Sequence, residues 1–223
     1  MARQAIIGEE ATRTGTRETI FLTAERLFAE CGFDGVSVRD IAAAAQANIA
    51  AVNYHFGSKG DLLLEIFNVR TRELNGERRQ MLREAEQRHG GNPPLREVLR
   101  ALLGPPILWR DPASGKATAS RFITRALYEV TEKLRVILEN NVGHLQYFVA
   151  PLARALPGVH ERDICWALHF TLGALHHNTE INFKRLELLA HAPCGTADFN
   201  QVLERLLDFT EAGFRQLPRS KSV

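Results

Sequence analysis

The chain has 223 residues, which is enough for one or two domains with a sizeable core. Its composition, with 45% hydrophobic and 24% charged residues, is typical of a soluble globular protein and excludes a disordered chain. The 28 basic and 26 acidic side chains leave a net charge of +2. This near-neutral total excludes a polybasic tail as the means of binding nucleic acid or membrane.

We expect the protein to be cytoplasmic and to have no membrane partner. No run approaches the roughly 18 apolar residues of a membrane span, and residues 1–10 lack the apolar segment of a secretory signal. The cysteines Cys31, Cys165 and Cys194 are odd in number and lack the spacing of a metal site. Reduced thiols in a cytoplasm are the simplest interpretation.

The N-terminal part of the chain is predicted to be helical. Apolar residues recur every three or four positions over residues 17–31, and Thr16 is available as the N-cap of that helix. Ser37 begins a short second helix, because the sequence there is close to a capping box with Asp at the usual Glu position. Asn48 is a good N-cap for a third helix. Ser58 caps a longer fourth helix that carries a stripe of apolar residues.

The remainder is also helical. The first strong break lies at residues 89–94, and Pro93 is predicted to begin a helix that ends at Gly104. Further helical segments follow, over residues 116–155, with a break near 130, and over 162–189 and 199–214. The segment 162–189 is apolar on almost every side, which predicts burial on more than one face. Since no strand alternation is found, the predicted fold class is all-α.

The second and third predicted helices have the pattern of a helix-turn-helix. The first of the pair is rich in alanine, which permits close packing, and the second presents polar or small residues to a major groove about 12 Å wide. That face draws on Asn48, Ile49, Ala51, Asn53 and Tyr54, and the residues that would grip phosphate are Arg39, Tyr54, His55 and Lys59. Taken alone, the pattern leaves a second interpretation open, in which residues 54–56 form a core aromatic cluster and Lys59 is a solvated charge.

The order of the motifs favours the first interpretation. Residues 28–33 (FAECGF), 36–42 (VSVRDIA) and 52–59 (VNYHFGSK) closely resemble the N-terminal domain of TetR-family transcription repressors. The resemblance implies a helix-turn-helix DNA-binding domain over residues 13–62 and a helical ligand-binding and dimerisation domain over 63–217. It implies that the protein is not an enzyme and binds a double-stranded DNA operator.

The resemblance also implies roles for single positions. Ser37 would cap the second helix and touch phosphate, and Arg39 would approach a base or phosphate. The third helix would be the recognition helix, with Asn48, Ile49, Ala50, Ala51 and Asn53 facing base edges, while Tyr54, His55 and Lys59 would hold the DNA backbone. The sequence departs from the family pattern where Gln46 replaces the usual turn glycine, where Asn53 stands at a common tyrosine position, and where Gly60 replaces a frequent glutamate.

The charge of the N-terminal part is a separate constraint. Residues 1–60 contain six basic and seven acidic side chains, a net charge of −1. This argues against strong non-specific binding to nucleic acid, although it leaves specific binding open. Arg13 and Arg17 are candidates for an arm that reaches phosphate, with a merely disordered arm as the alternative.

The C-terminal part is predicted to form a homodimer and to hold a small-molecule effector. The dimer candidates are apolar residues of the last two long helices, which can equally fill the core of one subunit: Leu168, Leu172, Leu175, Val202, Leu206 and Phe209. The ligand candidates, each of which can also be ordinary core, are Phe122, Arg125, Tyr128, His144, Phe148, Trp166 and Phe170. Residues 121–127, 165–170 and 173–175 resemble the subgroup of the family that answers to fatty acids or their acyl derivatives.

Other classes of protein are less well supported. The sequence has no zinc-protease, serine-hydrolase, phosphate-loop or dinucleotide motif, so no catalytic residue or cofactor is expected. His169, His176 and His177 lack further ligands at motif spacing, so no metal site is expected. The prediction is therefore a ligand-responsive repressor that binds a palindromic operator as a dimer. The alternative is a helical dimer that acts as an activator or adaptor without small-molecule control.

Overall fold

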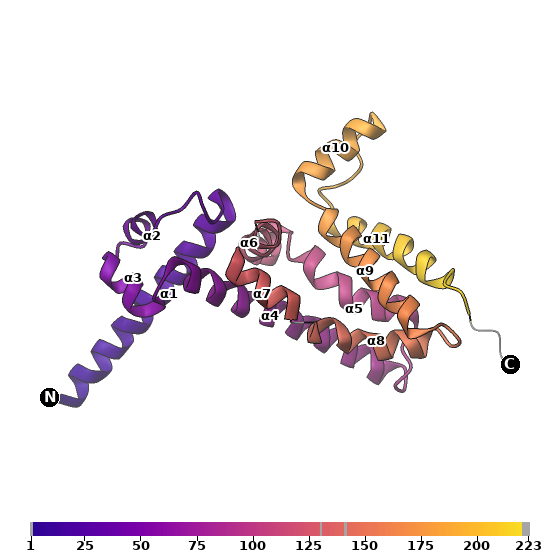
Figure 1. Cartoon of the computed structure of the whole chain (residues 1–223), viewed down its shortest axis with the longest axis horizontal. Coiled ribbons are helices and arrows are strands. Elements are labelled where there is room, and N and C mark those ends of the chain that lie inside the picture. Colours follow the sequence, from indigo (N-terminus) through magenta and orange to yellow (C-terminus); the bar gives the residue numbers. More distant parts are fainter. Residues whose placement is uncertain (1, 130, 141, 220–223) are drawn as a thin grey trace. The chain divides into compact units, whose positions relative to one another are not determined.

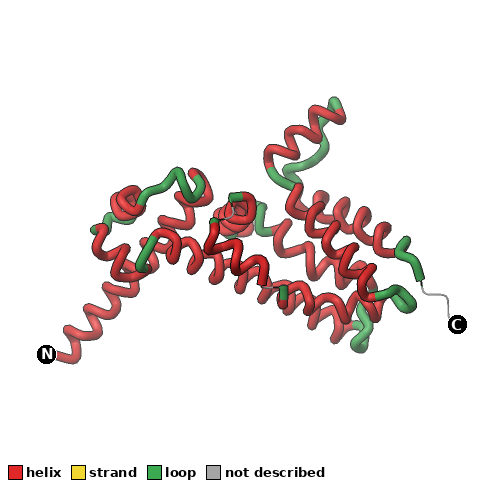
Figure 2. Tube along the Cα trace, in the orientation of Figure 1, coloured by secondary structure: helices red, strands yellow, loops and turns green. Residues whose placement is uncertain are grey.

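The computed structural model describes the backbone of residues 2–129, 131–140 and 142–219, with side chains from residue 15 onward except at positions 133 and 140. Of these described residues 78% are helical and none lies in a strand, which confirms the all-α fold class. Short loops join the helices (Figures 1 and 2). The chain forms two compact units: residues 1–72 with 116–140, and residues 73–115 with 141–223.

The first unit contains the helix-turn-helix. Its elements are α1 (Ala2–Cys31), α2 (Val38–Ala44), α3 (Ile49–Phe56), the first part of α4 (Lys59–Arg88), α6 (Ala117–Tyr128) and α7 (Glu132–Asn140). Helix α1 packs most extensively on α6 and also contacts α2 and α3. Because α1 begins at Ala2, Thr16 lies inside this helix and the N-cap predicted there is wrong.

The core of the first unit joins α1 to the helix-turn-helix. Ile20, Phe28, Ile41 and Val52 come from α1, α2 and α3 and are almost completely buried. Burying side chains of this size contributes about 1.5–3 kcal/mol each, so the apolar faces of these helices hold them together. The predicted apolar repeat over residues 17–31 includes the core residues Ile20 and Phe28 of α1, although its last member, Cys31, is exposed.

A buried ion pair fixes α1 against α4. The Glu25 carboxylate is buried and accepts two hydrogen bonds from Arg70, from Nε at 2.6 Å and from Nη2 at 2.8 Å. The Arg70 guanidinium also lies over the Phe21 ring, 5.4 Å from its centroid. A bidentate pair of this kind restricts the relative rotation of the two helices.

The second unit contains the rest of α4 together with α5 (Leu95–Leu108), a 3-10 turn at Pro112–Ser114, α8 (Gly143–Ala155), α9 (Glu161–His177), α10 (Glu180–Ala190) and α11 (Phe199–Arg215). Helix α11 packs mainly on α5 and also on α9, and α8 packs on both α5 and α9. The core includes Leu102, Phe148, Ile164, Leu207 and Phe214.

Helix α5 departs from the prediction at both ends. It begins at Leu95 with Pro94 as its N-cap, and it continues through Pro105 and Pro106 to Leu108 instead of ending at Gly104. Proline has no N–H for the carbonyl four residues earlier, so Pro106 leaves the Leu102 carbonyl without its helical donor. Arg78 Nε of α4 donates to this oxygen at 2.9 Å, so a side chain replaces the missing backbone bond.

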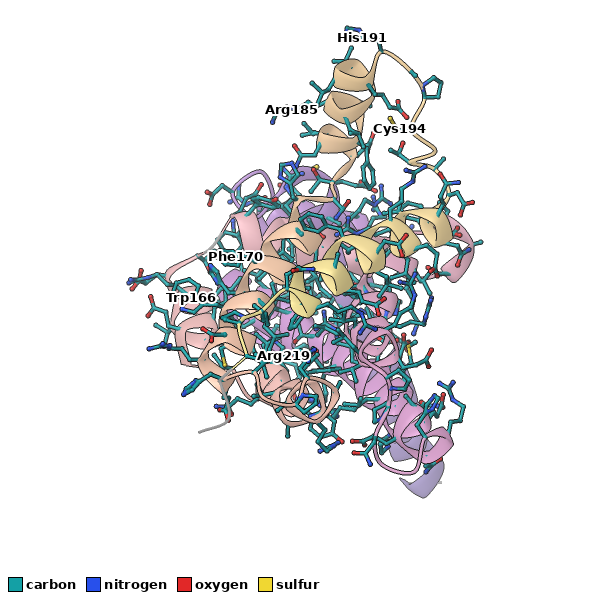
Figure 3. All side chains as sticks on the ribbon, turned by 90° about the vertical axis from the view of Figure 1, so that its right-hand side faces the viewer. Trp166, Phe170, Arg185, His191, Cys194 and Arg219 are labelled. Atoms are coloured by element: carbon teal, nitrogen blue, oxygen red, sulfur yellow. The ribbon has the colours of Figure 1, made fainter. Side chains whose placement is uncertain are left out.

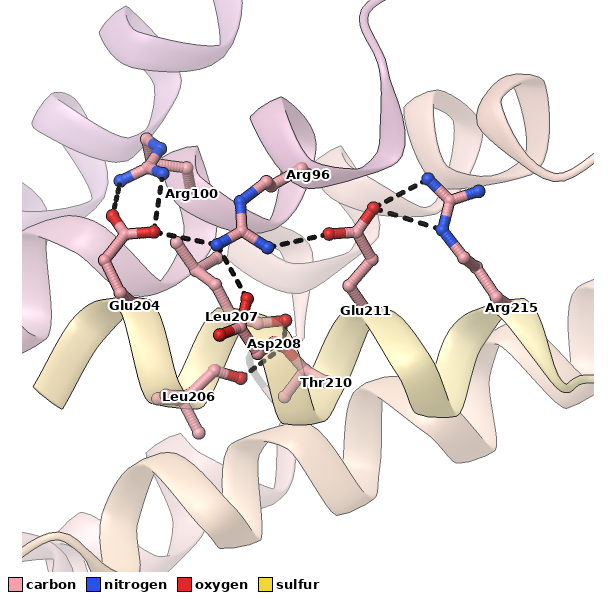
Figure 4. A network of polar contacts seen from close by, with 9 residues as sticks. All are labelled: Arg96, Arg100, Glu204, Leu206, Leu207, Asp208, Thr210, Glu211 and Arg215. Carbon is pink, nitrogen blue, oxygen red and sulfur yellow. Dashed lines mark hydrogen bonds and ion pairs between the residues drawn. The ribbon is translucent and has the colours of Figure 1, made fainter. Parts of the chain in front are cut away.

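A network of charged side chains joins α5 to α11 (Figure 4). Arg96 contacts Glu204, Asp208 and Glu211 at 2.8 Å each, and Arg100 Nη1 lies 2.6 Å from Glu204. Hydrogen bonds from Arg100 and Arg96 lower the pKa of Glu204 to about 2. The network therefore stays ionised at neutral pH and adds a polar attachment beside the apolar contact of the two helices.

Two longer predicted helices are divided. The segment 116–155 forms α6, α7 and α8, and the segment 162–189 forms α9 and α10. Thr179 accounts for the second division, because its Oγ1 accepts from Asn182 N and caps α10. The predicted domain boundary after residue 62 lies inside α4, and the first unit also includes residues 116–140. The assignment of functions to 13–62 and 63–217 stays a prediction.

Candidate nucleic-acid interface

The first helix of the motif, α2, is fixed by its N-cap. Ser37 Oγ accepts from Asp40 N at 3.2 Å, and Asp40 Oδ2 accepts from Ser37 N at 2.8 Å and from Ser37 Oγ at 2.6 Å. This is the predicted capping box with aspartate in place of glutamate. The hydrogen bonds from Ser37 lower the pKa of Asp40. Ser37 and Arg39 are both exposed at this end of α2, as a contact with phosphate requires.

The turn between the two helices keeps a tight geometry without glycine. Gln46 has φ 51°, in the left-handed region. Its N–H donates to Ala43 O at 3.2 Å, and Ala47 N donates to Ala42 O at 2.9 Å. These two bonds form a Schellman motif, in which glycine is the usual residue at the left-handed position. Gln46, which stands where the family usually has glycine, therefore keeps the turn conformation, and its left-handed backbone is strained.

The second helix of the motif, α3, presents one face to solvent. Asn48 Oδ1 accepts from Ala51 N at 2.6 Å and caps the helix as predicted. Val52 and Phe56 are buried and attach the inner face of α3 to the core. The outward residues, all exposed, are Ile49, Ala50, Asn53 and Tyr54, the last with 69% of its surface exposed. Ala51 and His55 are half-buried at the edges of this face. A short, capped helix with such a face has the shape needed to enter a major groove.

Lys59 has a role that sequence reasoning missed. Its Nζ donates to Phe33 O and Val36 O, both at 2.9 Å, and lies 4.0 Å from the centroid of the Phe33 ring. The side chain thus attaches the first turn of α4 to the segment just before α2. An ammonium has three N–H groups, so one N–H is left for the predicted phosphate contact. Lys59 therefore positions the motif in addition to any contact with DNA.

Three acidic residues near the motif have partners within the first unit. Glu25 pairs with Arg70, Glu30 lies 3.2 Å from Arg26, and Asp40 is bound to Ser37. Arg70 lies outside residues 1–60, so its pair with Glu25 compensates one of the acidic charges counted in the net charge of −1. Arg17 pairs with Glu65 and lies over the Phe56 ring, so this residue of the predicted arm is attached to the folded unit. Arg13 lies outside the described side chains.

Helix α6 is attached to the end of α1 by specific contacts. Arg125 Nη1 donates to Glu30 O at 2.9 Å, and Glu129 Oε2 accepts from Phe33 N at 3.1 Å. The rings of Phe122 and Phe28 pack with centroids 6.4 Å apart. A Cβ at Gly32 would lie 2.5 Å from the Glu129 carboxylate, so a larger residue there would displace it. An i,i+4 Arg125–Glu129 pair was visible in the sequence, but its contacts with α1 were not.

The predicted ligand residues are distributed over both units. Phe122, Arg125 and Tyr128 belong to α6 of the first unit, where Phe122 is buried, Arg125 bonds to Glu30 and Glu129, and Tyr128 is exposed. His144, Phe148, Trp166 and Phe170 belong to the second unit, where His144 is half-buried and Phe148 is part of the core. Trp166 and Phe170 are more than half exposed on α9 and stack with centroids 5.7 Å apart (Figure 3).

Most of the predicted dimer residues lie inside the second unit. Leu168, Leu175, Val202 and Leu206 are buried and Leu172 is half-buried, so the chain itself covers them. Phe209, in contrast, is 71% exposed on α11. The apolar residues that remain available on α9 and α11 are Trp166, Phe170 and Phe209, which we call the aromatic surface. The ligand role predicted for Trp166 and Phe170 stays a prediction, because a periodic pattern cannot distinguish an inner from an outer aromatic residue.

The described part of the chain offers neither a metal-ion cluster nor a membrane-spanning helix. No group of three or more His, Cys, Asp or Glu residues there could hold a metal ion. No described helix is long and apolar enough to cross a membrane.

Comparison with protein families gives two matches. A model described as "Tetracyclin repressor-like, C-terminal domain" matches residues 100–213, and one described as "Bacterial regulatory proteins, tetR family" matches residues 20–66. The second range contains the whole helix-turn-helix with its caps.

Two individual relatives match the chain at modest sequence identity or over a short segment. The chain is similar to the "HTH-type transcriptional dual regulator CecR" of Shigella flexneri, with 28% identity over 170 residues, 74% of this chain and 72% of the relative. It is 41% identical over 51 residues to the "Probable HTH-type transcriptional regulator YttP" of Bacillus subtilis, a match that spans 23% of this chain and 25% of that protein.

Solved structures share the fold. The TetR-family regulator PfmR from Thermus thermophilus aligns with a TM-score of 0.59 and 21% identity, over 90% of this chain and 99% of that one. HlyIIR, a hemolysin II transcriptional regulator, aligns with a TM-score of 0.57 and 19% identity, over 88% of this chain and 97% of that one.

Proposed function

Because the chain belongs to the TetR family of bacterial transcription regulators, which are non-enzymatic DNA-binding proteins, we propose that it is a ligand-responsive repressor. It binds a palindromic operator as a homodimer in the cytoplasm and is released by a small apolar or amphipathic effector. The observation that carries the DNA-binding part is the exposed, capped face of α3.

The chemistry of this face supports base recognition. Asn53 can donate and accept through its amide, the pattern that pairs with the major-groove edge of adenine. Ile49 and Ala50 are apolar and can contact the methyl group of thymine. Tyr54, His55 and Arg39 lie around this face with groups that can bond to phosphate oxygens. The predicted DNA contacts therefore remain our assignment: Ser37, Arg39, Asn48, Ile49, Ala51, Asn53, Tyr54, His55 and Lys59.

A dimer is supported by the aromatic surface. Helix-turn-helix proteins place two recognition helices about 34–36 Å apart to enter successive major grooves, so a second copy extends the contact with DNA. Trp166, Phe170 and Phe209 are apolar groups whose exposure to water is unfavourable. A second copy of this chain would bury them. We expect Phe209→Glu to convert the dimer to a monomer in sedimentation equilibrium, while Val136→Glu, at an exposed position on α7, leaves it unchanged.

Effector control is supported by the position of α6. This helix lies within residues 100–213, the range of the C-terminal family model, yet it packs on α1 in the unit that carries the helix-turn-helix. A change in α6 would therefore act directly on α1 through Arg125 and Glu129. The extent to which an effector releases DNA is limited by how much more tightly it binds the state with low operator affinity than the state with high operator affinity.

The proposed function is tested by retardation of DNA fragments taken from upstream of the gene and its neighbours. We expect one fragment to bind specifically, with an affinity that falls steeply with salt. Tyr54→Ala should weaken this binding about tenfold, the loss of one hydrogen bond to a charged group. Tyr147→Ala, an exposed tyrosine of α8, is the matched control and should have no effect. Equal binding of all fragments, or equal effects of both substitutions, would refute the proposal.

Activation is the second candidate function. The printed name of the Shigella flexneri relative describes a dual regulator, and an exposed α3 serves activation and repression equally well. A reporter gene placed downstream of the bound fragment distinguishes repression from activation. Repression predicts higher expression when the gene is deleted, and activation predicts lower expression.

A further inference from the structure

Helix α10 carries aliphatic side chains that its own chain leaves uncovered. None of its residues is buried, and Figure 1 shows the helix standing apart from α9 and α11. Ile181, Leu188 and Leu189, which we call the aliphatic face, are each more than 70% exposed. Single exposed leucines are ordinary on a protein surface. Three large aliphatic side chains on one helix of 11 residues instead form a patch that is typical of an interaction site.

The inner side of α10 is held by its own unit. Glu187 Oε1 accepts from Cys194 N at 3.4 Å and from Thr196 Oγ1 at 3.0 Å, so the segment that returns towards α11 lies against this side. Phe183, one turn before Glu187, is half-buried and packs against the core of the second unit. These contacts fix which side of the helix points away from the chain.

The outward side of α10 faces the same way as the aromatic surface. Because an α-helix has 3.6 residues per turn, Ile181, Arg185 and Leu188 share the side opposite to Phe183 and Glu187. In Figure 3, the labelled Arg185 extends towards the side on which Trp166 and Phe170 lie, whereas Cys194 lies on the other side. Only two residues separate the end of α9 from the start of α10. The aliphatic face and the aromatic surface are therefore neighbours on one side of the second unit.

The length of α10 also indicates that something packs on it. Isolated helices shorter than about 12–15 residues are only marginally stable in water. Helix α10 has 11 residues and no buried position, so its own unit supplies little of the apolar contact that normally stabilises a short helix. An occupant of the aliphatic face would supply the rest.

The size of the aromatic surface identifies that occupant as a second copy of this chain. Trp166, Phe170 and Phe209 are 56–71% exposed, which corresponds to roughly 300–500 Å² of surface. A stable interface buries about 800 Å² on each partner, so the aromatic surface alone is too small for a stable dimer. The aliphatic face adds roughly 150–250 Å² on the same side of the unit, and the aliphatic stems of Lys184 and Arg185 extend it further.

We propose that α10 packs its aliphatic face against a second copy of this chain and so completes the dimer contact that the aromatic surface begins. The inference rests on the homodimer of the proposed function. In a dimer with two-fold symmetry each copy presents the same surface, so both α10 helices are covered and every contact is made twice.

The test is sedimentation equilibrium of the full chain at several concentrations. Leu188→Glu should raise the dissociation constant of the dimer about tenfold to a hundredfold, because each copy loses the burial of one aliphatic side chain. Leu188→Ala, which adds no charge, should raise it less. Leu22→Glu, at an exposed leucine of α1, is the matched control and should leave the constant unchanged. Because Leu188 is 74% exposed, its variants should keep the helical content of the original chain, which circular dichroism checks.

Amide hydrogen exchange locates the contact directly. In the original chain, exchange over residues 181–189 should slow as the protein concentration rises through the dissociation constant, because α10 is covered only in the dimer. Phe209→Glu, which we expect to be monomeric, should exchange rapidly over the same residues at every concentration.

The outcomes separate this contact from the proposed function. Equal dissociation constants for Leu188→Glu and Leu22→Glu, or exchange over 181–189 that does not change with concentration, would overturn the role of α10. If Phe209→Glu still dissociates the dimer in those cases, the homodimer stands and only the α10 contact fails. A chain that is monomeric at every concentration would overturn both, while operator retardation would still test DNA binding by itself.

A membrane surface is the other occupant that the test addresses. Binding of the original chain to phosphatidylglycerol vesicles that Leu188→Glu abolishes, with the dissociation constant of the dimer unchanged, would also overturn the proposal. We expect no such binding and a change in the dissociation constant instead.

Discussion

Replacing Gln46 with glycine should stabilise the protein. Gln46 is exposed and has φ 51°, in a conformation that costs an L-residue roughly 1–2 kcal/mol relative to the right-handed region. Glycine avoids that cost, but it gives the unfolded chain about 0.4–1 kcal/mol more conformational freedom to lose. The difference predicts a gain of about 0.5–1 kcal/mol for Gln46→Gly, with the turn and the orientation of α3 unchanged.

The assay is urea unfolding followed by circular dichroism, with the midpoint and slope fitted separately. Ala43→Gly is the control, because Ala43 is exposed and lies inside α2 in a helical conformation. Glycine there should lower the free energy of unfolding by roughly 0.5–1 kcal/mol. The two neighbouring substitutions thus have opposite predicted signs. A loss of stability in both variants would show that Gln46 is not in the left-handed region and that the turn is not the Schellman motif described.

Three further predictions concern charged side chains. Glu25→Gln should lower stability by about 1.5–3 kcal/mol in urea unfolding, because the buried Glu25 loses its charge-assisted hydrogen bonds from the half-buried Arg70; a change below about 1 kcal/mol would contradict this role of the pair. Lys59→Met should lower the melting temperature as well as the operator affinity, since Lys59 Nζ holds two backbone carbonyls; an unchanged melting temperature would leave only a phosphate contact. Glu204 has a depressed pKa, so its contribution to stability is present above its ordinary pKa of 4.5 and is lost as the pH falls from 4.5 towards 2. Because 46% of the Glu204 side chain is exposed, this contribution is about 1 kcal/mol at most. Glu204→Gln should remove it, and the free energy of unfolding measured between pH 7 and pH 2 tests this.

Local chemistry made parts of the motif predictable. Ser37 and Asn48 cap their helices through hydrogen bonds to residues three positions ahead, and such contacts are set by neighbours in the sequence. The resemblance implied that Phe56 belongs to the core, where the structure places it, whereas the burial of Val52 was not predicted. The two caps were therefore visible before the fold was known.

Contacts between distant parts of the chain were not predictable. Lys59 meets carbonyls 23 and 26 positions earlier, and Arg125 reaches the Glu30 carbonyl 95 positions away. Arg78 compensates for Pro106 across two helices, which is why α5 continues where the proline pair predicted its end. Periodicity indicates that a residue lies on an apolar face of a helix but not what covers that face, so the exposure of Trp166 and Phe170 on α9 could not be predicted.

The central claim is that α3 reads DNA bases. The most direct measurement is selection of binding sites from a randomised duplex library by the original chain, by Asn53→Ala and by Asn200→Ala, an exposed asparagine of α11. We predict that the original chain and Asn200→Ala enrich the same palindrome, with half-sites about 10 base pairs apart or a multiple of that spacing. Asn53→Ala should relax the preference at a position repeated in both half-sites. Failure of the original chain to enrich any sequence, or selection of the same bases by all three proteins, would contradict the account.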